Sequence, residues 1–365
     1  MTPQRKIFTM PSYTTVSGHP VKNLQVGYET YGTLNAACDN VILVCHHFSG
    51  NAHAAGRYSD GDAMPGWWDG AIGPGKVIDT DRYFVVCSDT PCCIKVFDGH
   101  VVTTGPATLN PDTGRPYGPD FPLVTIADFV HIQKKLLEHL GIDHLEAVAG
   151  PSAGSAQAIQ WAVEYPESVS RVMAVISPGL YLHPYARSLT ECWGSPITVD
   201  AAWKNGAYAI DQQPLKGLTE AYRVVSVTAL SPAFIERNFG HTWADPKRDP
   251  RLALANEFKA HADLGALAAA NASVSDANHF LYMLRACCTY NVLSRIGNAR
   301  AKFLFLPVES DLVFPPFMSE QAVGEIRAAG GRAELAILNA DGGHFDGLHK
   351  FDQARELVHR FLASD

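Results

Sequence analysis

Ser152 is the residue of this chain whose neighbours best suit it to act as a nucleophile. Gly150 and Gly154 flank it two positions away on each side, in the pattern G-x-S-x-G. An apolar run, residues 145–149, predicts a strand before the serine, and the alanine-rich residues 153–165 predict a helix after it. A serine in a sharp strand-to-helix turn is the arrangement that exposes its hydroxyl to an acyl carbon. The alternative is a purely structural glycine turn.

A serine hydroxyl needs a base to take its proton and an acid to orient that base. In the chain order serine, acid, histidine, Asp311 follows the predicted strand 303–307, and His344 follows the next predicted strand, 333–338. The carboxyl ends of parallel strands meet at one rim of a sheet, so we expect both side chains to reach Ser152. The alternatives are an Asp311 that only caps a turn and a His344 that is merely exposed.

Acyl transfer also requires N–H donors for the negative charge that develops on the carbonyl oxygen. We expect one donor to be the backbone N–H of Ala153, directly after the serine. We expect the second to be the N–H of Phe48, in the loop after the predicted strand 41–45. The histidines in and beside this loop have no carboxylate or cysteine at ligand spacing, so we expect no metal site.

The elements that must position these residues alternate between short apolar runs and helical stretches. Valine-rich runs predict buried parallel strands, and two alternating segments near the N-terminus predict antiparallel edge strands. This order predicts an α/β fold with a mostly parallel central sheet and helices on both faces. The predicted strands are residues 6–16, 24–31, 41–45, 83–87, 145–149, 172–176, 302–307 and 333–338, and the predicted core helices are residues 126–140, 153–165, 319–329 and 352–363.

Residues 180–298 interrupt this alternation. They contain few valine runs, many aromatic side chains and amphipathic stretches such as residues 218–230 and 276–292. We therefore expect a core domain made of residues 1–179 and 299–365, with residues 180–298 inserted as a helical lid. The active site is expected between the two.

The composition excludes several classes of partner. The chain has 365 residues and 47% hydrophobic content, enough to bury a large core. Its net charge of −8, with both signs interspersed, gives no electrostatic footprint for nucleic acid or an anionic membrane. No stretch is apolar enough for a membrane span or an export signal, so we expect a cytoplasmic protein. The eight cysteines lack any C-x-x-C spacing and are expected to be free thiols.

Several stretches resemble the homoserine O-acetyltransferase family of α/β-hydrolase-fold proteins, and together they cover nearly the whole chain. They are residues 45–53 (CHHFSGNAH), 65–70 (PGWWDG), 73–76 (GPGK), 79–84 (DTDRYF), 110–122 and 310–316 (SDLVFPP). The resemblance implies a triad of Ser152, Asp311 and His344 and a ping-pong mechanism through an acyl-enzyme. It also implies a helical lid whose helices often form a homodimer, and no cofactor beyond an acyl donor.

The chain departs from this family at the positions that bind the amino acid. Phe345 follows the histidine where the family usually has an aspartate, and Tyr222 and Ala229 stand where its lid usually carries an arginine and a tyrosine. Arg223 and Asp346 each lie one residue out of register, and one step along a helix turns a side chain by roughly 100°. Because a buried charge without its partner costs several kcal/mol, we expect homoserine to bind poorly.

Three functions are consistent with the sequence. The leading hypothesis is a carboxylic-ester hydrolase that acts on short-chain acyl esters, above all acetyl esters of apolar or uncharged alcohols, without a cofactor. Replacements beside the nucleophile, Ala153 and Ser155, and within residues 92–104 put the family's acyl-donor pocket in question as well. The first alternative is an O-acyltransferase that uses acyl-CoA, with homoserine or another alcohol as acceptor. The second is a non-catalytic binding protein on a hydrolase fold, against which the intact acid and histidine argue.

Overall fold

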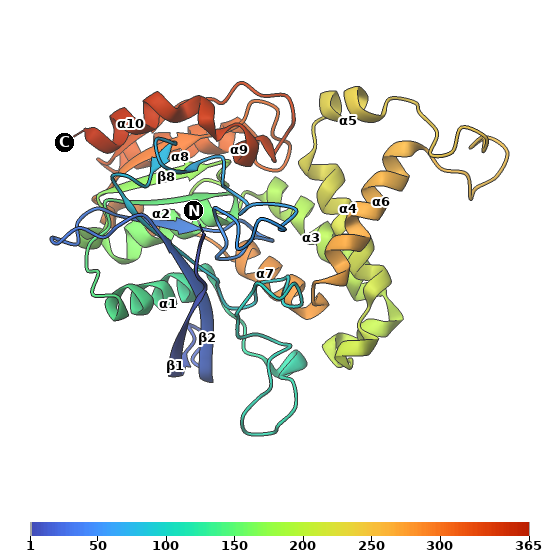
Figure 1. Ribbon diagram of the computed structural model, residues 1–365, viewed down its shortest axis with the longest axis horizontal. Coiled ribbons are helices and arrows are strands. Elements are labelled where there is room, and N and C mark those ends of the chain that lie inside the picture. Colours follow the sequence, from blue (N-terminus) through green and yellow to red (C-terminus); the bar gives the residue numbers. More distant parts are fainter. Residues whose placement is uncertain (1, 365) are drawn as a thin grey trace.

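The computed structural model describes residues 2–364, and its centre is an eight-stranded sheet (Figure 1). The strand order is β1-β2-β6-β3-β7-β8-β9-β10. The pairs β1–β2 and β2–β6 are antiparallel, and all the other pairs are parallel, which confirms the predicted fold class. The strands are β1 (Lys6–Thr14), β2 (Pro20–Tyr31), β3 (Val41–Cys45), β6 (Phe84–Ser88), β7 (Ala147–Pro151), β8 (Arg171–Val175), β9 (Lys302–Leu306) and β10 (Arg332–Leu335).

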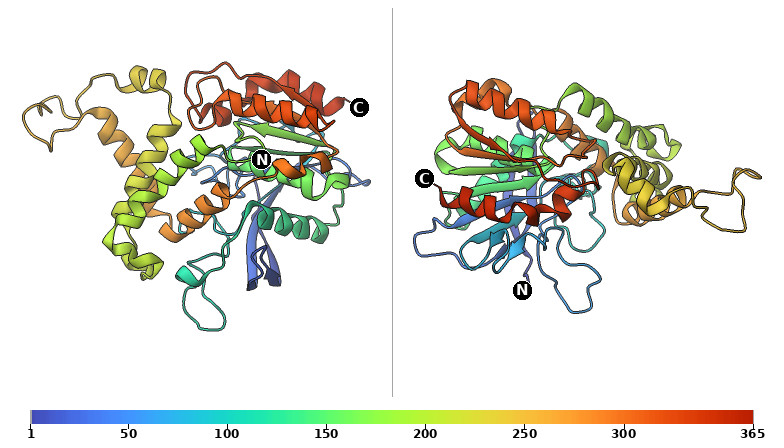
Figure 2. Two further views of the ribbon diagram at one scale, coloured as in Figure 1. Left: turned by 180° about the vertical axis from the view of Figure 1, so that it is seen from behind. Right: turned by 90° about the horizontal axis from the view of Figure 1, so that it is seen from above.

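Helices cover both faces of the sheet because successive strand residues point to opposite sides. In β9, Phe303 and Phe305 join the hydrophobic cluster of one face, whereas Leu304 and Leu306 join that of the other. Seen from above, α8 and α10 lie on opposite sides of the strands (Figure 2). The first face is covered by α1 (Ile126–His139), α2 (Ala153–Glu164) and α8 (Pro316–Ala328), and the second by α10 (Arg355–Ala363) with the short α9 (Asp346–His349) beside it.

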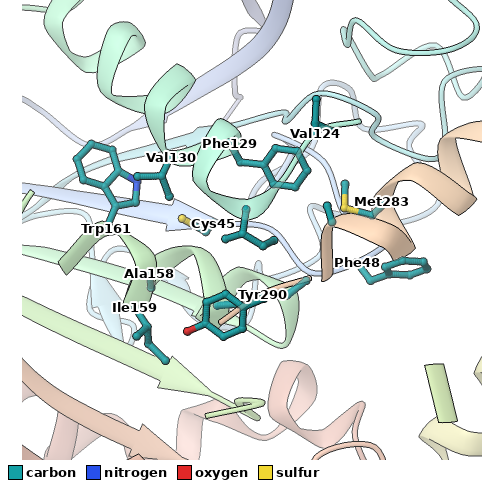
Figure 3. Packing of buried hydrophobic residues seen from close by; sticks show 14 of the residues in the cluster. Cys45, Phe48, Val124, Phe129, Val130, Ala158, Ile159, Trp161, Met283 and Tyr290 are labelled. Carbon is teal, nitrogen blue, oxygen red and sulfur yellow. The ribbon is translucent and has the colours of Figure 1, made fainter. Parts of the chain in front are cut away.

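The hydrophobic cluster on the first face is the larger of the two. It fills the space between α1, α2 and the sheet and extends to the segment between β8 and β9 (Figure 3). Phe129 of α1 and Trp161 of α2 are fully buried in it, and the Trp161 indole donates to the Gln133 side chain at 2.7 Å. Met283 and Tyr290, which lie far along the chain, belong to the same cluster. The segment between β8 and β9 therefore shares one core with the sheet.

That segment forms five helices, which lie to one side of the sheet in Figure 1. This is the helical insertion that the sequence predicts between residues 180 and 298. The division of the chain into a core domain and a lid stays a prediction about folding units. The helices are α3 (Pro184–Val199), α4 (Leu215–Ala229), α5 (Pro232–Phe239), α6 (Lys259–Ser273) and α7 (Ala277–Cys288).

Several elements differ from the expected ones. Strand β2 begins at Pro20 instead of residue 24, and β7 covers Ala147–Pro151 instead of residues 145–149. Two short strands, β4 (Ile72–Gly73) and β5 (Ile78–Asp79), pair in the stretch between β3 and β6, where the sequence predicts no strand. A two-residue strand is too short to show alternation in a sequence. Strand β10 ends at Leu335 instead of Leu338, although the Leu338 N–H still donates to the Pro307 carbonyl at 2.8 Å.

Within residues 2–364, no helix has both the length and the apolar character that crossing a bilayer requires. Within the same residues, no three histidine, cysteine, aspartate or glutamate side chains are grouped so that they could hold a metal ion.

Candidate active site

Strand β7 leads into Ser152, and α2 begins directly after it. Ser152 has φ 56° and ψ −122°, a strained backbone conformation for a residue with a Cβ atom. Glycine is required at positions 150 and 154 because other backbone atoms approach both residues closely. A Cβ atom on Gly154 would lie 2.1 Å from the Cys45 carbonyl oxygen, and one on Gly150 would lie 2.5 Å from the Gly154 backbone. The G-x-S-x-G pattern therefore lets β3, β7 and α2 meet beneath the serine.

The structure brings the predicted triad together from three separate loops. The Ser152 hydroxyl donates to His344 Nε2 at 2.9 Å, and His344 Nδ1 donates to Asp311 Oδ2 at 2.7 Å. The residues expose only 8%, 7% and 2% of their surfaces, respectively. The side chains predicted to be nucleophile, base and orienting acid thus lie within hydrogen-bond reach of one another, which is an arrangement that can activate a serine hydroxyl.

The loop that carries the histidine is held against the end of α4. The His344 N–H donates to the Ala229 carbonyl at 2.8 Å, so Ala229 touches the site through its backbone. Gly343 has φ 89°, and a Cβ atom there would lie 2.5 Å from the same carbonyl oxygen. The Phe314 ring meets the imidazole edge-on at 5.3 Å. The position of the base therefore depends on how the inserted helices pack.

The backbone N–H groups of Phe48 and Ala153 suit the binding of an oxyanion. Both residues line the cavity at Ser152. Neither N–H donates to an acceptor within residues 2–364. Two free donors beside a nucleophilic serine are what a developing negative charge on the substrate oxygen requires.

A buried histidine orients the peptide group that carries the Phe48 N–H. His46 Nδ1 donates to the His47 carbonyl at 2.7 Å, and the Gly50 N–H donates to the same oxygen at 2.9 Å. Because a peptide group is planar and trans, fixing this carbonyl fixes the Phe48 N–H on its opposite side. His46 Nε2 accepts from the Thr90 hydroxyl at 3.1 Å. Burial lowers the pKa of His46 to about 4, so the ring is neutral, as this tautomer requires.

The cavity at Ser152 is small and uncharged, with a volume of about 30 Å³. The polar groups of Tyr290, Thr190 and Trp193 already donate to protein acceptors, at 3.2, 2.9 and 3.0 Å. No described residue of its lining carries a charge, which favours a short, uncharged acyl group. The lining residues are Phe48, Ser152, Ala153, Ala156, Pro178, Leu182, Thr190, Trp193, Leu284, Cys287, Tyr290 and Phe314.

The two aromatic residues expected in the substrate pocket do not line this cavity. The Tyr222 hydroxyl is hydrogen-bonded to Ser275 Oγ at 2.7 Å, and its ring packs edge-on against Phe280 at 5.5 Å. Phe280 in turn packs against Phe48 at 5.1 Å, so Tyr222 reaches the site only through two other rings. Phe345, half-buried at the start of α9, packs against the larger cluster.

The two offset charged residues also face other partners. The Arg223 guanidinium donates to the Glu220 carboxylate at 3.1 Å and to the His261 carbonyl at 3.0 Å, between α4 and α6. The Asp346 carboxylate accepts the Gly342 N–H at 2.7 Å, within its own loop. Neither side chain lines the cavity beside Ser152.

The sequence patterns did not identify the residues of the inserted segment that line the cavity. Trp193 comes from α3, Leu284 and Cys287 come from α7, and Leu182 comes from the segment before α3. The amphipathic pattern of residues 276–292 was the only signal for Leu284 and Cys287, and it does not extend to Trp193 or Leu182. Such a pattern marks a buried helix face without identifying what it packs against.

Comparisons with known proteins agree with this geometry. Residues 40–350 match the family described as alpha/beta hydrolase fold. The homoserine O-acetyltransferase of Methanosphaerula palustris is 40% identical over 353 residues, which span 95% of this chain and 70% of that protein. The chain belongs to the homoserine O-acetyltransferase family of α/β hydrolases. The resemblance that the sequence motifs indicated is thereby confirmed.

The solved structures to which this chain is similar include proteins named for two activities. The crystal structure of esterase E22 is 41% identical, with a TM-score of 0.94, and the match covers 99% of this chain and 100% of that one. Homoserine O-acetyltransferase from Bacillus anthracis is 34% identical with the same TM-score of 0.94, covering 100% of this chain and 99% of that one. Family membership therefore leaves both ester hydrolysis and acetyl transfer open.

Proposed function

We propose that this protein is a serine carboxylic-ester hydrolase of short-chain acyl esters, above all acetyl esters of uncharged alcohols. The observation that carries the proposal is the uncharged cavity at Ser152, whose other polar groups are already hydrogen-bonded within the protein. The charged side chains nearest in sequence to the family's recognition positions, Arg223 and Asp346, face other partners, so a zwitterionic acceptor would leave its charges unpaired, at a cost of several kcal/mol. The likeness to esterase E22 supports the same assignment.

In the proposed mechanism, Ser152 Oγ attacks the ester carbonyl carbon while His344 Nε2 takes the hydroxyl proton. Asp311 holds the imidazole in the required tautomer and stabilises its protonated form. The Phe48 and Ala153 N–H groups donate to the carbonyl oxygen as it gains negative charge. His344 then protonates the departing alcohol, and a water molecule, deprotonated by the same histidine, hydrolyses the acyl-enzyme.

Acyl transfer from acyl-CoA to homoserine or another alcohol is the second candidate. It is favoured by the homoserine O-acetyltransferases that align over 95% of this chain. It would form the same acyl-enzyme, with the CoA thiol as the leaving group instead of an alcohol, and an alcohol instead of water would then accept the acyl group.

One assay separates these functions. Free acid release is measured from p-nitrophenyl acetate, and both free acid and free CoA are measured from acetyl-CoA, with and without homoserine, for the wild type and for Ser152→Ala. The proposal expects ester hydrolysis that homoserine does not change and that Ser152→Ala abolishes. Consumption of acetyl-CoA only when homoserine is present would instead establish a transferase.

A fluorophosphonate probe tests the non-catalytic alternative on the same two proteins. Covalent labelling of the wild type but not of Ser152→Ala is the expected result, because the probe reacts only with an activated serine. An unlabelled wild type without hydrolysis would point to a binding protein.

We also propose that the protein is a cytoplasmic homodimer that associates through the inserted helices. Leu215 and Val227 of α4 and Leu267 of α6 support this proposal, since these apolar residues each expose about half of their surface, 46%, 46% and 52%. Exposed apolar residues on neighbouring helices are typical of a surface that a partner covers.

A further inference from the structure

Two hollows adjoin the contact between α3 and α7. One is the cavity of about 30 Å³ at Ser152, and the other is a groove of about 490 Å³ on the outside of the same helices. On α3, Trp193 lines the cavity, whereas the next residue, Gly194, lines the groove. Within residues 2–364, Leu284 is the one residue that lines both hollows.

The wall between the hollows is thin at Leu284 because α3 and α7 approach closely there. A Cβ atom on Gly194 would lie 3.0 Å from Leu284 Cδ2. The other large side chain of the wall, Trp193, is anchored by its indole N–H, which donates to the Thr228 hydroxyl at 3.0 Å. Leu284 is held only by apolar packing and exposes 6% of its surface.

We infer that Leu284 sets the length of the acyl chain that the enzyme accepts, and that the groove behind it is a latent subsite for a linear aliphatic acyl chain. This inference rests on the proposed ester hydrolysis. A cavity of about 30 Å³ has room for about two water-sized groups and therefore suits an acetyl group. A chain of several more methylenes must pass Leu284 to find space.

The groove has the character that such a chain needs. Leu281, Tyr282 and Leu284 of α7 give it an apolar floor. Its charged residues, Glu191 and Arg285, are exposed, so they can keep contact with water when the floor is covered. Each methylene that moves from water onto such a surface contributes roughly a fourfold gain in binding.

The test compares kcat/KM for p-nitrophenyl acetate, butyrate and octanoate in the wild type and in Leu284→Ala. We expect the octanoate-to-acetate ratio to rise by at least about tenfold in the variant, because part of the roughly fourfold gain per methylene becomes available. The control is Leu264→Ala on α6, a leucine that is also 6% exposed but lines neither hollow. Its ratio is expected to match the wild type.

A ratio measured within one protein sample does not depend on how much of that sample is folded. Leu284→Phe provides a second test of opposite sign, since a larger side chain is expected to lower the butyrate-to-acetate ratio. An unchanged ratio in Leu284→Ala, or an equal rise in Leu264→Ala, would overturn the role of Leu284 while leaving ester hydrolysis intact. A wild type without Ser152-dependent hydrolysis of any of the three esters would overturn both proposals.

Discussion

The two carboxylate oxygens of Asp311 have different partners. Oδ2 accepts the Nδ1 proton of His344, while Oδ1 accepts the backbone N–H groups of Val313 and Phe314 at 2.8 and 3.0 Å. All the surrounding groups are donors, so only an ionised carboxylate satisfies every one of them. The residue thus fixes its own loop and the imidazole together.

Replacing Asp311 by asparagine tests this double role. In Asp311→Asn the amide keeps one acceptor oxygen but must turn its NH2 group toward one set of donors. If the NH2 group meets Nδ1, the imidazole must carry its proton on Nε2 and cannot accept one from Ser152. We expect kcat for ester hydrolysis to fall by about 10⁴-fold, measured beside the circular dichroism spectrum to verify folding. A well-folded variant within tenfold of wild-type activity would contradict the assigned role.

At the scale of elements, the site depends on how closely β3, β7 and α2 meet. The Cys45 carbonyl at the end of β3 faces the first turn of α2 with no room for a side chain at Gly154. The obstacle is backbone, which cannot move away as the end of a flexible side chain can. The two elements must separate if that position gains a methyl group.

Gly154→Ala is therefore expected to lower the free energy of unfolding by several kcal/mol and to abolish hydrolysis. The matched control is Gly324→Ala in the exposed part of α8, where a Cβ atom would meet nothing within 4 Å. That substitution is expected to raise stability by roughly 0.5–1 kcal/mol, because alanine favours a helix interior over glycine. Urea unfolding of the two variants measures both effects, and similar stabilities would refute the close approach.

At the scale of the whole molecule, buried histidines join residues 46–50, residues 89–107 and the inserted helices. His279 of α7 donates from Nδ1 to the Cys93 carbonyl at 2.9 Å, and its Nε2 accepts the Ala107 N–H at 3.1 Å. Burial lowers the pKa of His46, His47 and His279 below the ordinary histidine value. All three rings are thus harder to protonate in the folded protein than in the unfolded chain.

This arrangement predicts an acid-sensitive fold. Unfolded histidines bind protons near pH 6.5, whereas the folded ones stay neutral, so the unfolded chain binds more protons as the pH falls. The free energy of unfolding is expected to be level for these groups above pH 6.5. Below pH 6.5, the free energy of unfolding is expected to fall by about 1.4 kcal/mol per pH unit for each of these histidines. The fall ends when the pH reaches the pKa of that histidine in the folded protein. For His46 that limit is about 4.

Urea unfolding at pH 7.5, 6.0 and 5.0 measures this loss. His279→Gln is expected to show a shallower slope, because glutamine does not titrate. The control Leu264→Ala, which changes no titratable group, should keep the wild-type slope. Equal slopes in all three proteins would show that His279 is not held neutral by the fold.

The sequence by itself determined the order of the strands and helices and the positions of Ser152, Asp311 and His344 at strand ends. These are local properties: the glycines around Ser152 satisfy a steric need within one turn, and side chains after parallel strands meet at one rim. The stretches that resemble the homoserine O-acetyltransferase family indicated the same three residues. The juxtaposition of the three side chains could be predicted, whereas their catalytic role stays a prediction until Ser152→Ala is assayed.

Only the tertiary structure decided which inserted side chains face the serine. The spacing of apolar residues shows that a helix has a buried face, but it does not say which partner covers that face or at what angle. The positions of Arg223 and Asp346 outside the cavity, and of Trp193 and Leu284 in its wall, depend on that packing. Contacts between residues far apart in the chain fix this arrangement, and no local pattern encodes them.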